Sequence, residues 1–300
     1  MGSDDLQRAM GLDKPRRRTV TADELKTLSV VIPAYNEEAT IAQAVQAARQ
    51  GVAKLGVDGE VLVSASGCTD HTAEVAREAG AGVVVAGRGK GEAITCGVES
   101  AKGDVICLMD ADLEYYGDVP LVELLAGPIF QGIADATIAN LYWRPIYPDH
   151  WLNGFFAPLA GLLFPEMLPK VGSTPWSGQR AAVRALWPET LPGGFTSDLA
   201  ITLHWNDHAD LLRPVLTDDW FNPVRPKPEI LGQDFALLMH HADKQGRIQP
   251  SLTGPIEAWF RGVERLITDY DESHPDPMGY QQQLFEQSHR ELLRQITAPE

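Results

Sequence analysis

The sequence predicts an α/β protein whose centre is a mainly parallel, doubly wound sheet with flanking helices. Three observations indicate this class. Short runs rich in Val and Ile alternate with helical patterns between residues 28 and 109, as they do in β–α–β units. Polar, glycine-containing segments follow these runs, where connecting loops are expected. The chain has 300 residues, which is long enough to bury a large core without disulfides.

Each predicted element rests on a local pattern. The segments LSVVIP and DVICLM are continuous apolar runs, which are typical of strands buried on both faces. Between such runs, Ala and Val recur at helical spacing, so we expect a crossover helix in each gap. The expected strands are 28–33, 60–65, 82–86 and 104–109, and the expected helices are 37–52, 70–79 and 92–101.

The two ends of the chain differ from this central part. Residues 1–25 are polar and contain three consecutive arginines, and we expect a loose arm there. An apolar periodic run predicts a helix over 199–212. Residues 255–297 predict two amphipathic helices, divided by the segment SHPDP at 273–277. We expect this helical C-terminal extension to pack on the rest of the chain or on a partner in a homodimer.

The composition excludes several classes of protein. With 25 Lys and Arg against 41 Asp and Glu, the net charge is −16, which argues against a nucleic-acid binder or a protein held to anionic lipid by charge. The three cysteines, Cys68, Cys96 and Cys107, are not spaced as a metal clip. We expect reduced thiols and a cytoplasmic protein. The apolar stretches are short and contain prolines, so we expect no membrane span.

Polar loops follow the predicted strands. Ligands of parallel sheets bind at the carboxyl ends of the strands, so these loops should meet at one edge of the sheet. The four segments are PAYNEE at 33–38, SGCTD at 66–70, GRGKGE at 87–92 and DAD at 110–112.

Two of these segments suggest a phosphate-bearing ligand. Asp110-Ala111-Asp112 offers hard oxygen ligands for Mg²⁺ or Mn²⁺ and leaves coordination positions for phosphate oxygens. The alternative is a solvated turn. In Gly89-Lys90-Gly91 the glycines would let the backbone approach a ligand and the lysine would supply a positive charge. The alternative is a flexible turn, and neither GxGxxG nor GxxxxGK[ST] is present.

Together the four loops resemble a known family. VVIPAYNEEATI, SGCTDHT, GRGKGEA and LMDADL, in this order and spacing, look like the nucleotide-sugar domain of GT-A-fold glycosyltransferases, and within them resemble the glucosyl-3-phosphoglycerate synthases. The resemblance continues more weakly through 142–145, 177–179, 192–195 and 225–226. It implies a GT-A (Rossmann-like) fold and a metal-dependent enzyme that moves a hexose from a UDP-sugar to an acceptor hydroxyl with retention of anomeric configuration.

The resemblance also implies roles on the donor side. Asp112 would hold Mg²⁺ or Mn²⁺ on the diphosphate, and Lys90 would meet the diphosphate or the ribose. Ser66 would touch the uracil. The residues expected to bind the nucleotide sugar are Pro33, Ala34, Tyr35, Glu37, Ser66, Lys90, Asp110 and Ala111.

A third expected catalytic residue, beside Lys90 and Asp112, is Asp198. It stands where the family has a glutamate, and we expect it to contact the transferred sugar or the acceptor. The alternative is an N-cap of the following helix. The family's second metal ligand is a histidine before an Arg-Pro pair, and counting back from Arg225 places Asn222 there.

The acceptor side departs from the family. The expected acceptor-binding residues are Arg144, Gln179 and Arg180, but the segment at 151–160 has no Lys or Arg where the family has an arginine-bearing loop. We therefore expect its apolar side chains to line a pocket for a neutral, partly hydrophobic small molecule. The implied organisation is a nucleotide-sugar-binding domain at 26–145, an acceptor-binding half at 146–250 and the extension at 251–300.

Alternatives remain at this point. A sugar-1-phosphate nucleotidyltransferase also has a parallel sheet and a metal-binding Asp, but it would carry a Gly-rich loop after the first strand. A non-catalytic nucleotide-sugar-binding protein would share the same loops. His204 and His208 have the spacing of a zinc helix, but Trp205 occupies the Glu position of HExxH. Trp176 or Trp220 could offer an aromatic platform to a sugar.

Overall fold

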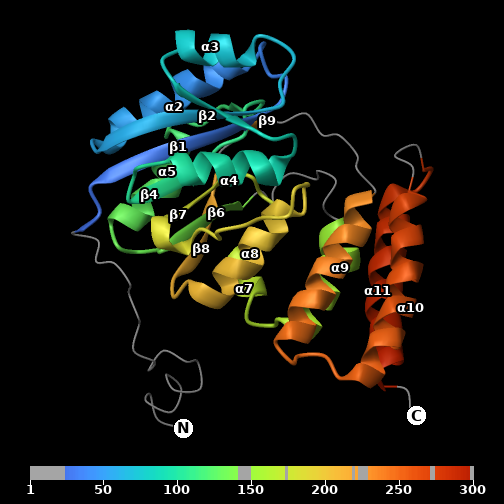
Figure 1. Ribbon diagram of the computed structural model, residues 1–300. Coiled ribbons are helices and arrows are strands. Elements are labelled where there is room, and N and C mark those ends of the chain that lie inside the picture. Colours follow the sequence, from blue (N-terminus) through green and yellow to red (C-terminus); the bar gives the residue numbers. More distant parts are fainter. Residues whose placement is uncertain are drawn as a thin grey trace.

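A seven-stranded sheet forms the centre of the computed structural model (Figure 1). The structure describes residues 24–140, 150–172, 175–217, 220–221, 229–270 and 274–297. The strand order is β3-β2-β1-β4-β7-β6-β8. The strands are β1 (Thr27–Ala34), β2 (Asp58–Ser66), β3 (Gly82–Ala86), β4 (Val105–Leu108), β6 (Ala136–Asn140), β7 (Arg180–Val183) and β8 (Leu212–Leu216).

The first half of the sheet confirms the predicted doubly wound arrangement. Strands β1 to β4 are mutually parallel, and each lies within a few residues of its predicted position. The connecting helices are α2 (Ile41–Leu55), α3 (Thr72–Glu78) and α4 (Lys90–Ser100). Helices α2 and α3 pack on each other and on β2, and α4 packs on β1, β2 and β3. Because the chain reverses its direction across the sheet after β3, right-handed crossovers place α4 on the opposite face.

Strand β7 gives the sheet its mixed character. It runs antiparallel to both β4 and β6, and all four of its residues are buried. Its first residue, Arg180, pairs with Leu108, the last residue of β4. The residues just before β7 therefore lie beside those just after β4. The sheet continues across residue 145, so the predicted acceptor half supplies two strands to the sheet of the predicted nucleotide-sugar domain.

Several short elements were not predicted from the sequence. Helix α5 (Leu121–Phe130) contains Pro128, a residue that is unfavourable inside a helix. A π-helix η2 (His150–Phe156) leads directly into α6 (Ala157–Leu163), and α7 (Leu168–Val171) and a 3₁₀ turn η3 (Arg184–Leu186) have only a few residues each. Helix α8 (Ser197–His208) matches the expected helix but ends earlier.

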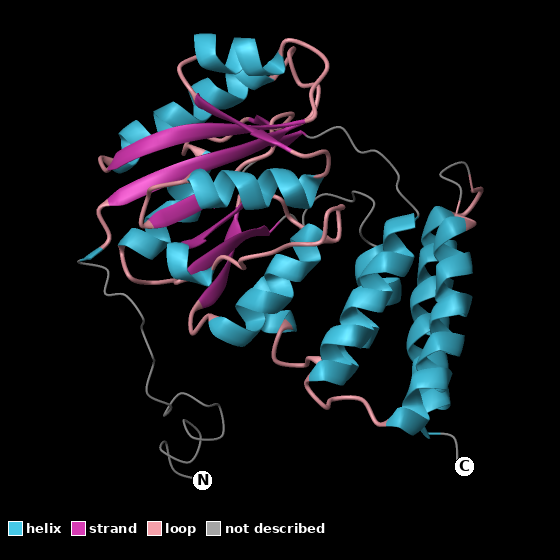
Figure 2. Cartoon of the chain, viewed as in Figure 1, coloured by secondary structure: helices cyan, strands magenta, loops and turns pink. Residues whose placement is uncertain are grey.

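The C-terminal helices stand beside the sheet as a separate layer (Figure 2). They are α9 (Glu229–Lys244), α10 (Pro250–Thr268) and α11 (Pro277–Thr297), and the last two confirm the predicted amphipathic pair. A row of aromatic rings joins this layer to η2. Phe235 of α9 stacks on Phe260 of α10 with ring centroids 4.0 Å apart, and Phe260 meets Phe155 of η2 at 5.5 Å.

The segment at 151–160 does not line an open pocket, which corrects the expectation drawn from its apolar sequence. Phe155, Phe156 and Leu159 are fully buried. Helices α10 and α11 pack on η2, and the hydroxyl group of Ser288 in α11 donates a hydrogen bond to the carbonyl of Gly154. The segment is apolar because it forms the core between the sheet and the helical layer.

A small second sheet lies next to the DAD segment. Strand β5 (Glu114–Tyr115) pairs antiparallel with β9 (Trp220–Phe221), and Glu114 pairs with Phe221. The main chain just before residue 222 is therefore held beside Glu114, which is two residues after Asp112. A search of the described helices found none with the length and apolar content that a membrane crossing requires.

The aromatic row predicts how strongly the helical layer is joined to the sheet. Replacing Phe155 by Ala leaves a cavity between η2 and α10, and should lower the free energy of unfolding by about 3–5 kcal/mol. Urea denaturation measures this change. The matched control is Leu293→Ala on α11, where the side chain is 60% exposed and a loss within about 0.5 kcal/mol is expected. Equal losses for the two variants would contradict the packing described here.

Candidate active site

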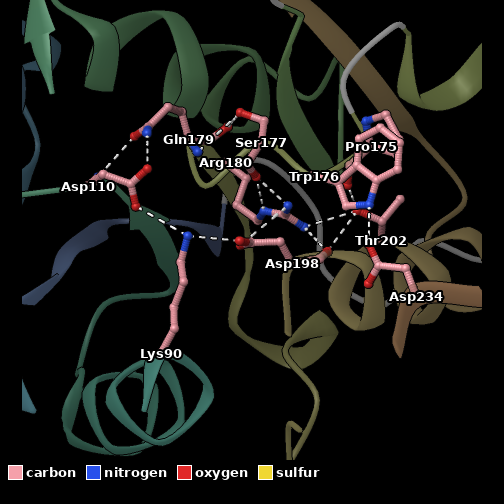
Figure 3. Close-up of polar contacts among 10 residues, drawn as sticks. All are labelled: Lys90, Asp110, Pro175, Trp176, Ser177, Gln179, Arg180, Asp198, Thr202 and Asp234. Carbon is pink, nitrogen blue, oxygen red and sulfur yellow. Dashed lines mark hydrogen bonds and ion pairs between the residues drawn. The ribbon is translucent and has the colours of Figure 1, made fainter. Parts of the chain in front are cut away.

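The ammonium group of Lys90 lies between two carboxylates at the edge of the sheet (Figure 3). Its Nζ atom is 2.8 Å from Oδ2 of Asp198 and 3.5 Å from Oδ1 of Asp110. Burial alone would lower the pKa of Lys90, but the charges of Asp110 and Asp198 outweigh it and raise the pKa above its ordinary value. The lysine is therefore held as a cation, and it joins α4, the end of β4 and the start of α8.

Gln179 fixes the orientation of Asp110. Its side-chain amide donates to Oδ2 of Asp110 at 2.6 Å, and its carbonyl oxygen accepts from the backbone N–H of Asp110 at 3.0 Å. An added Cβ at Gly178 would lie 2.6 Å from the same carboxylate, so this position has no room for a side chain. We predicted that Gln179 binds the acceptor, but the structure commits its amide to Asp110.

Arg180 lies beneath the site. It is fully buried, and its Nη2 atom is 3.7 Å from Oδ1 of Asp198. Its other donors bond the carbonyl of Ser177 and, through Nη1, the carbonyl of Asp198 and the hydroxyl of Thr202 at 3.0 and 3.1 Å. This burial does not support the expected contact with an acceptor. Arg180 instead holds Asp198 in place through its ion pair with the carboxylate and its hydrogen bond to the carbonyl.

Asp198 is not an N-cap. Helix α8 begins at Ser197, Thr196 occupies the cap position, and no side chain caps the helix through a hydrogen bond. The carboxylate of Asp198 turns toward Lys90 instead. An acid in the first turn is also favoured by the positive end of the helix dipole. Of the two interpretations of this residue, the structure favours the one that places it in the site.

The glycines of the GRGKGE loop admit a neighbouring segment of the chain. An added Cβ at Gly91 would overlap the carbonyl of Pro192, and one at Gly89 would overlap the carbonyl of Gly193. Gly89 also has a φ of 135°, which side-chain-bearing residues rarely adopt. These glycines therefore let the 192–194 segment approach α4, and this approach brings Asp198 to Lys90.

The PAYNEE and SGCTD loops bind each other through hydrogen bonds. Asn36 has a φ of 55°, and its side-chain oxygen accepts from the backbone N–H of Thr69 at 2.8 Å. The N–H groups of Glu37 and Glu38 donate to the hydroxyl of Thr72 and to a carboxylate oxygen of Asp70. Several residues of these motifs therefore hold the two loops together at the ends of β1 and β2.

The predicted nucleoside residues divide into two groups. The hydroxyl of Ser66 is buried and bonds the carbonyl of Gly87 at 2.6 Å and the N–H of Gly89 at 2.9 Å, so it shapes the loop and a direct contact with a base is not supported. Tyr35 is 42% exposed, and the guanidinium group of Arg88 lies 5.2 Å from its ring centroid. Sequence reasoning did not single out Arg88.

The predicted metal ligands are only partly described. Asp112 lies half-buried between Asp110 and β5, whereas Asn222 lies outside the described residues, as does the predicted acceptor residue Arg144. Within the described residues no cluster of three or more His, Cys, Asp or Glu could hold a metal ion. The hard carboxylate oxygens of Asp112 fit Mg²⁺ or Mn²⁺ that is completed by phosphate oxygens, whereas the oxygens of Asp110 are directed at Gln179 and Lys90.

A second buried acid was missed from the sequence. The indole N–H of Trp176 donates to Oδ2 of Asp234 in α9 at 2.8 Å. Burial raises the pKa of Asp234 to about 7; the hydrogen bond from Trp176 opposes this shift, and the charge of Asp198 adds to it. No sequence motif surrounds Asp234, because only the packing of α9 brings it to this place.

The remaining candidates, two tryptophans and a histidine pair, differ in their exposure and position. Trp220 is 7% exposed, which leaves little surface for a sugar to stack on, whereas Trp176 is half-buried. The rings of His204 and His208 stack at 4.2 Å in the second half of α8, and neither belongs to a metal-binding cluster among the described residues.

Comparisons with known proteins agree with this geometry. Residues 29–172 match the sequence family described as Glycosyl transferase family 2. The glucosyl-3-phosphoglycerate synthase of Mycobacterium tuberculosis is 33% identical over 181 residues, which cover 54% of this chain and 55% of that protein. The low-salt glycan biosynthesis hexosyltransferase of Haloferax volcanii is 36% identical over 128 residues, 42% of this chain and 30% of that protein. The match thus spans about half the length of the synthase and less than a third of the hexosyltransferase.

Solved structures extend the likeness over more of the fold. The M. tuberculosis glucosyl-3-phosphoglycerate synthase with Mn²⁺, UDP-glucose and phosphoglyceric acid has a TM-score of 0.61 and 26% identity, covering 79% of this chain and 88% of that chain. The same enzyme with Mg²⁺ and UDP has a TM-score of 0.60 and 27% identity, with the same coverage. The chain therefore has the GT-A fold and resembles these synthases.

The raised pKa of Asp234 predicts a pH-dependent effect on stability. The folded state binds the Asp234 proton more tightly than the unfolded state, where the pKa is near 3.8. Stability should therefore fall as the pH rises from about 4 to about 7, at up to about 1.4 kcal/mol per pH unit. Asp234→Asn removes this cost and keeps an acceptor for Trp176. The variant should exceed the wild type in free energy of unfolding at about pH 8, and the excess should shrink toward about pH 4. Urea denaturation across this range would contradict the assignment if the difference did not change with pH.

Proposed function

We propose that this chain is a metal-dependent glycosyltransferase that moves a hexose from a UDP-sugar to the hydroxyl group of a small-molecule acceptor. One observation carries the proposal. The DAD segment, Lys90 and Asp198 come from three separate parts of the chain and meet at the carboxyl edge of the parallel strands. In the similar solved structures the bound molecules include Mn²⁺ or Mg²⁺ with UDP or UDP-glucose, beside phosphoglyceric acid in one of them, and this chain's loops suit the same kind of donor.

The donor side follows from the loops. The exposed ring of Tyr35, with Arg88 beside it, and the adjacent Pro33, Ala34 and Glu37 would hold the nucleoside. Asp110 and Ala111 would lie at the ribose. The cation of Lys90 would face the diphosphate, whose negative charge grows as the bond to the sugar breaks, and a preorganised positive group stabilises such charge.

The metal would be held by the side chains of Asp112 and Asn222. The pairing of β5 with β9 supports this choice, because it holds the main chain just before Asn222 close to the DAD segment. When bound, Mg²⁺ or Mn²⁺ supplies positive charge to the two phosphates of the leaving group. Asp110 is oriented for the same region by Gln179.

We also propose retention of the anomeric configuration. Oδ2 of Asp198 pairs with Lys90 and Oδ1 faces Arg180, so both carboxylate oxygens are directed at cations and neither is directed at an acceptor hydroxyl. The bond from the acceptor oxygen to the anomeric carbon would form as the bond to the diphosphate breaks. The proton of the acceptor hydroxyl would then pass to the leaving phosphate oxygen. Three free thiols support the further proposal of a cytoplasmic enzyme.

Removal of the metal-binding carboxylate tests the donor site. Asp112→Ala should lower Mn²⁺-dependent transfer from UDP-glucose, and its hydrolysis, by at least about 100-fold, because the charge that stabilises the leaving group is lost. The circular dichroism spectrum should stay unchanged. Asp118→Ala, at an exposed acid a few residues further on, is the matched control and should keep full activity. Nucleotidyl transfer from UTP and glucose 1-phosphate, measured in parallel, would favour the nucleotidyltransferase alternative instead.

The stereochemical course can be read directly from the product. With UDP-α-glucose as donor, ¹H NMR recorded during turnover should show an α-anomeric proton in the first product formed. A β-product would contradict retention, and would require a carboxylate base in the site. The acceptor used here can be water, because the newly formed glucose reports its anomeric form before it mutarotates.

A further inference from the structure

Buried polar atoms without hydrogen bonds occur in the first turn of α8 and in α9. Oδ1 of Asp198, Oδ1 of Asp234 and Oγ of Ser197 have no hydrogen-bond partner among the described residues. The three side chains are 6% exposed or less. A buried hydrogen-bond acceptor without a partner lowers the stability of the folded state. Such an atom therefore indicates where a hydrogen-bond donor of a ligand belongs.

The position of these atoms separates them from the donor side. In Figure 3, Lys90 and Asp110 lie on one side of Asp198, and Asp234 with Trp176 lies on the other. The negative charge of Asp198 adds to the upward shift of the Asp234 pKa, so the two residues belong to the same region of the protein. The cations nearby are already used, because Lys90 bonds Asp198 and Arg180 is buried within its own hydrogen bonds.

The platform beside Asp234 is rigid. Trp176 meets the rings of Phe156 at 5.1 Å and Trp151 at 6.0 Å, both edge-on, while its indole N–H is held by Asp234. Helix α9 is fixed in turn, because Phe235 stacks on Phe260. A half-buried indole of this kind presents an apolar surface next to a carboxylate.

Resting on the proposed glycosyl transfer, we infer that Asp234 and Trp176 form the acceptor subsite and select neutral or cationic hydroxyl compounds over anionic ones. The hydroxyl or ammonium hydrogens of the acceptor would bond Oδ1 of Asp234, and its carbon skeleton would lie on Trp176. An acceptor that carries phosphate or carboxylate would instead meet two carboxyl groups with no unused cation among the described residues around them. Like charges repel each other more strongly in a buried site than in water.

Three acceptors that share one diol and differ in charge test this inference. They are glycerol 3-phosphate, glycerol and 3-amino-1,2-propanediol, each supplied with UDP-glucose and Mn²⁺. The wild type should use the amine and glycerol with a kcat/KM at least about tenfold above that for glycerol 3-phosphate. Asp234→Asn should reduce this preference by about tenfold through the acceptor KM, while the KM for UDP-glucose stays within about twofold.

A matched control separates this effect from a general loss of charge. Asp207→Asn removes an acid of α8 that pairs with His241 at 2.8 Å, away from the site, and should leave the order of acceptors unchanged. Trp176→Phe keeps an aromatic ring but loses the hydrogen bond to Asp234, and should raise the acceptor KM with a smaller change in charge preference.

A second readout does not depend on turnover. The indole proton of Trp176, assigned by its loss in Trp176→Phe, should shift in the NMR spectrum when the amine is added to the wild type, and not in Asp234→Asn. Equal behaviour of the three compounds, or an unchanged preference in Asp234→Asn, would overturn the inference. Absence of any Mn²⁺-dependent breakdown of UDP-glucose would instead contradict the proposed function, and the indole shift would still decide the inference.

Discussion

The site depends on one buried cation. Lys90 pairs with both Asp110 and Asp198, which belong to the end of β4 and the first turn of α8, and without it these two carboxylates would repel each other. A protein with a net charge of −16 can hold acids so close together only where positive groups are built in. Arg180 supplies the second charge from below. On the proposed function the same cation would face the diphosphate of the donor, so one interaction would serve both the fold and the chemistry.

The first half of the fold could be predicted from the sequence because its signals are local. Strands such as Val105–Leu108 are apolar runs flanked by turn residues, and alternation with helices dictates a parallel sheet. The second half depends on tertiary contacts. Strand β7 has only four residues and is inserted antiparallel between β4 and β6, which no periodicity reveals. The apolar segment at 151–160 was recognised as unusual but interpreted as a pocket wall, since sequence alone cannot tell an internal face from an open one.

The site shows the same limit. The resemblance to glycosyltransferases selected Lys90, Asp110 and Asp198, and the structure brings these three together. Gln179 and Arg180 were selected too, but their polar groups are taken up by Asp110 and Asp198, and a sequence does not show which partner a side chain has. Asp234 carries no motif and reaches the site through the packing of α9. Motif residues such as Asn36, whose left-handed backbone is matched by its bonds to Thr69, hold the PAYNEE and SGCTD loops together.

The aromatic row from Phe235 through Phe260 to Phe155 has an evolutionary consequence. The groups proposed to hold the donor come from the sheet and its first loops, whereas Asp234 belongs to a helix braced by the C-terminal layer. On the proposed assignment, a mutation in that layer would shift α9 and alter the choice of acceptor, while the loops proposed to hold the donor stay unchanged. Donor and acceptor preferences are in this sense separable traits. Descendants of one ancestral chain could diversify their products by repacking a few rings, without the intermediate loss of activity that remodelling the loops would bring.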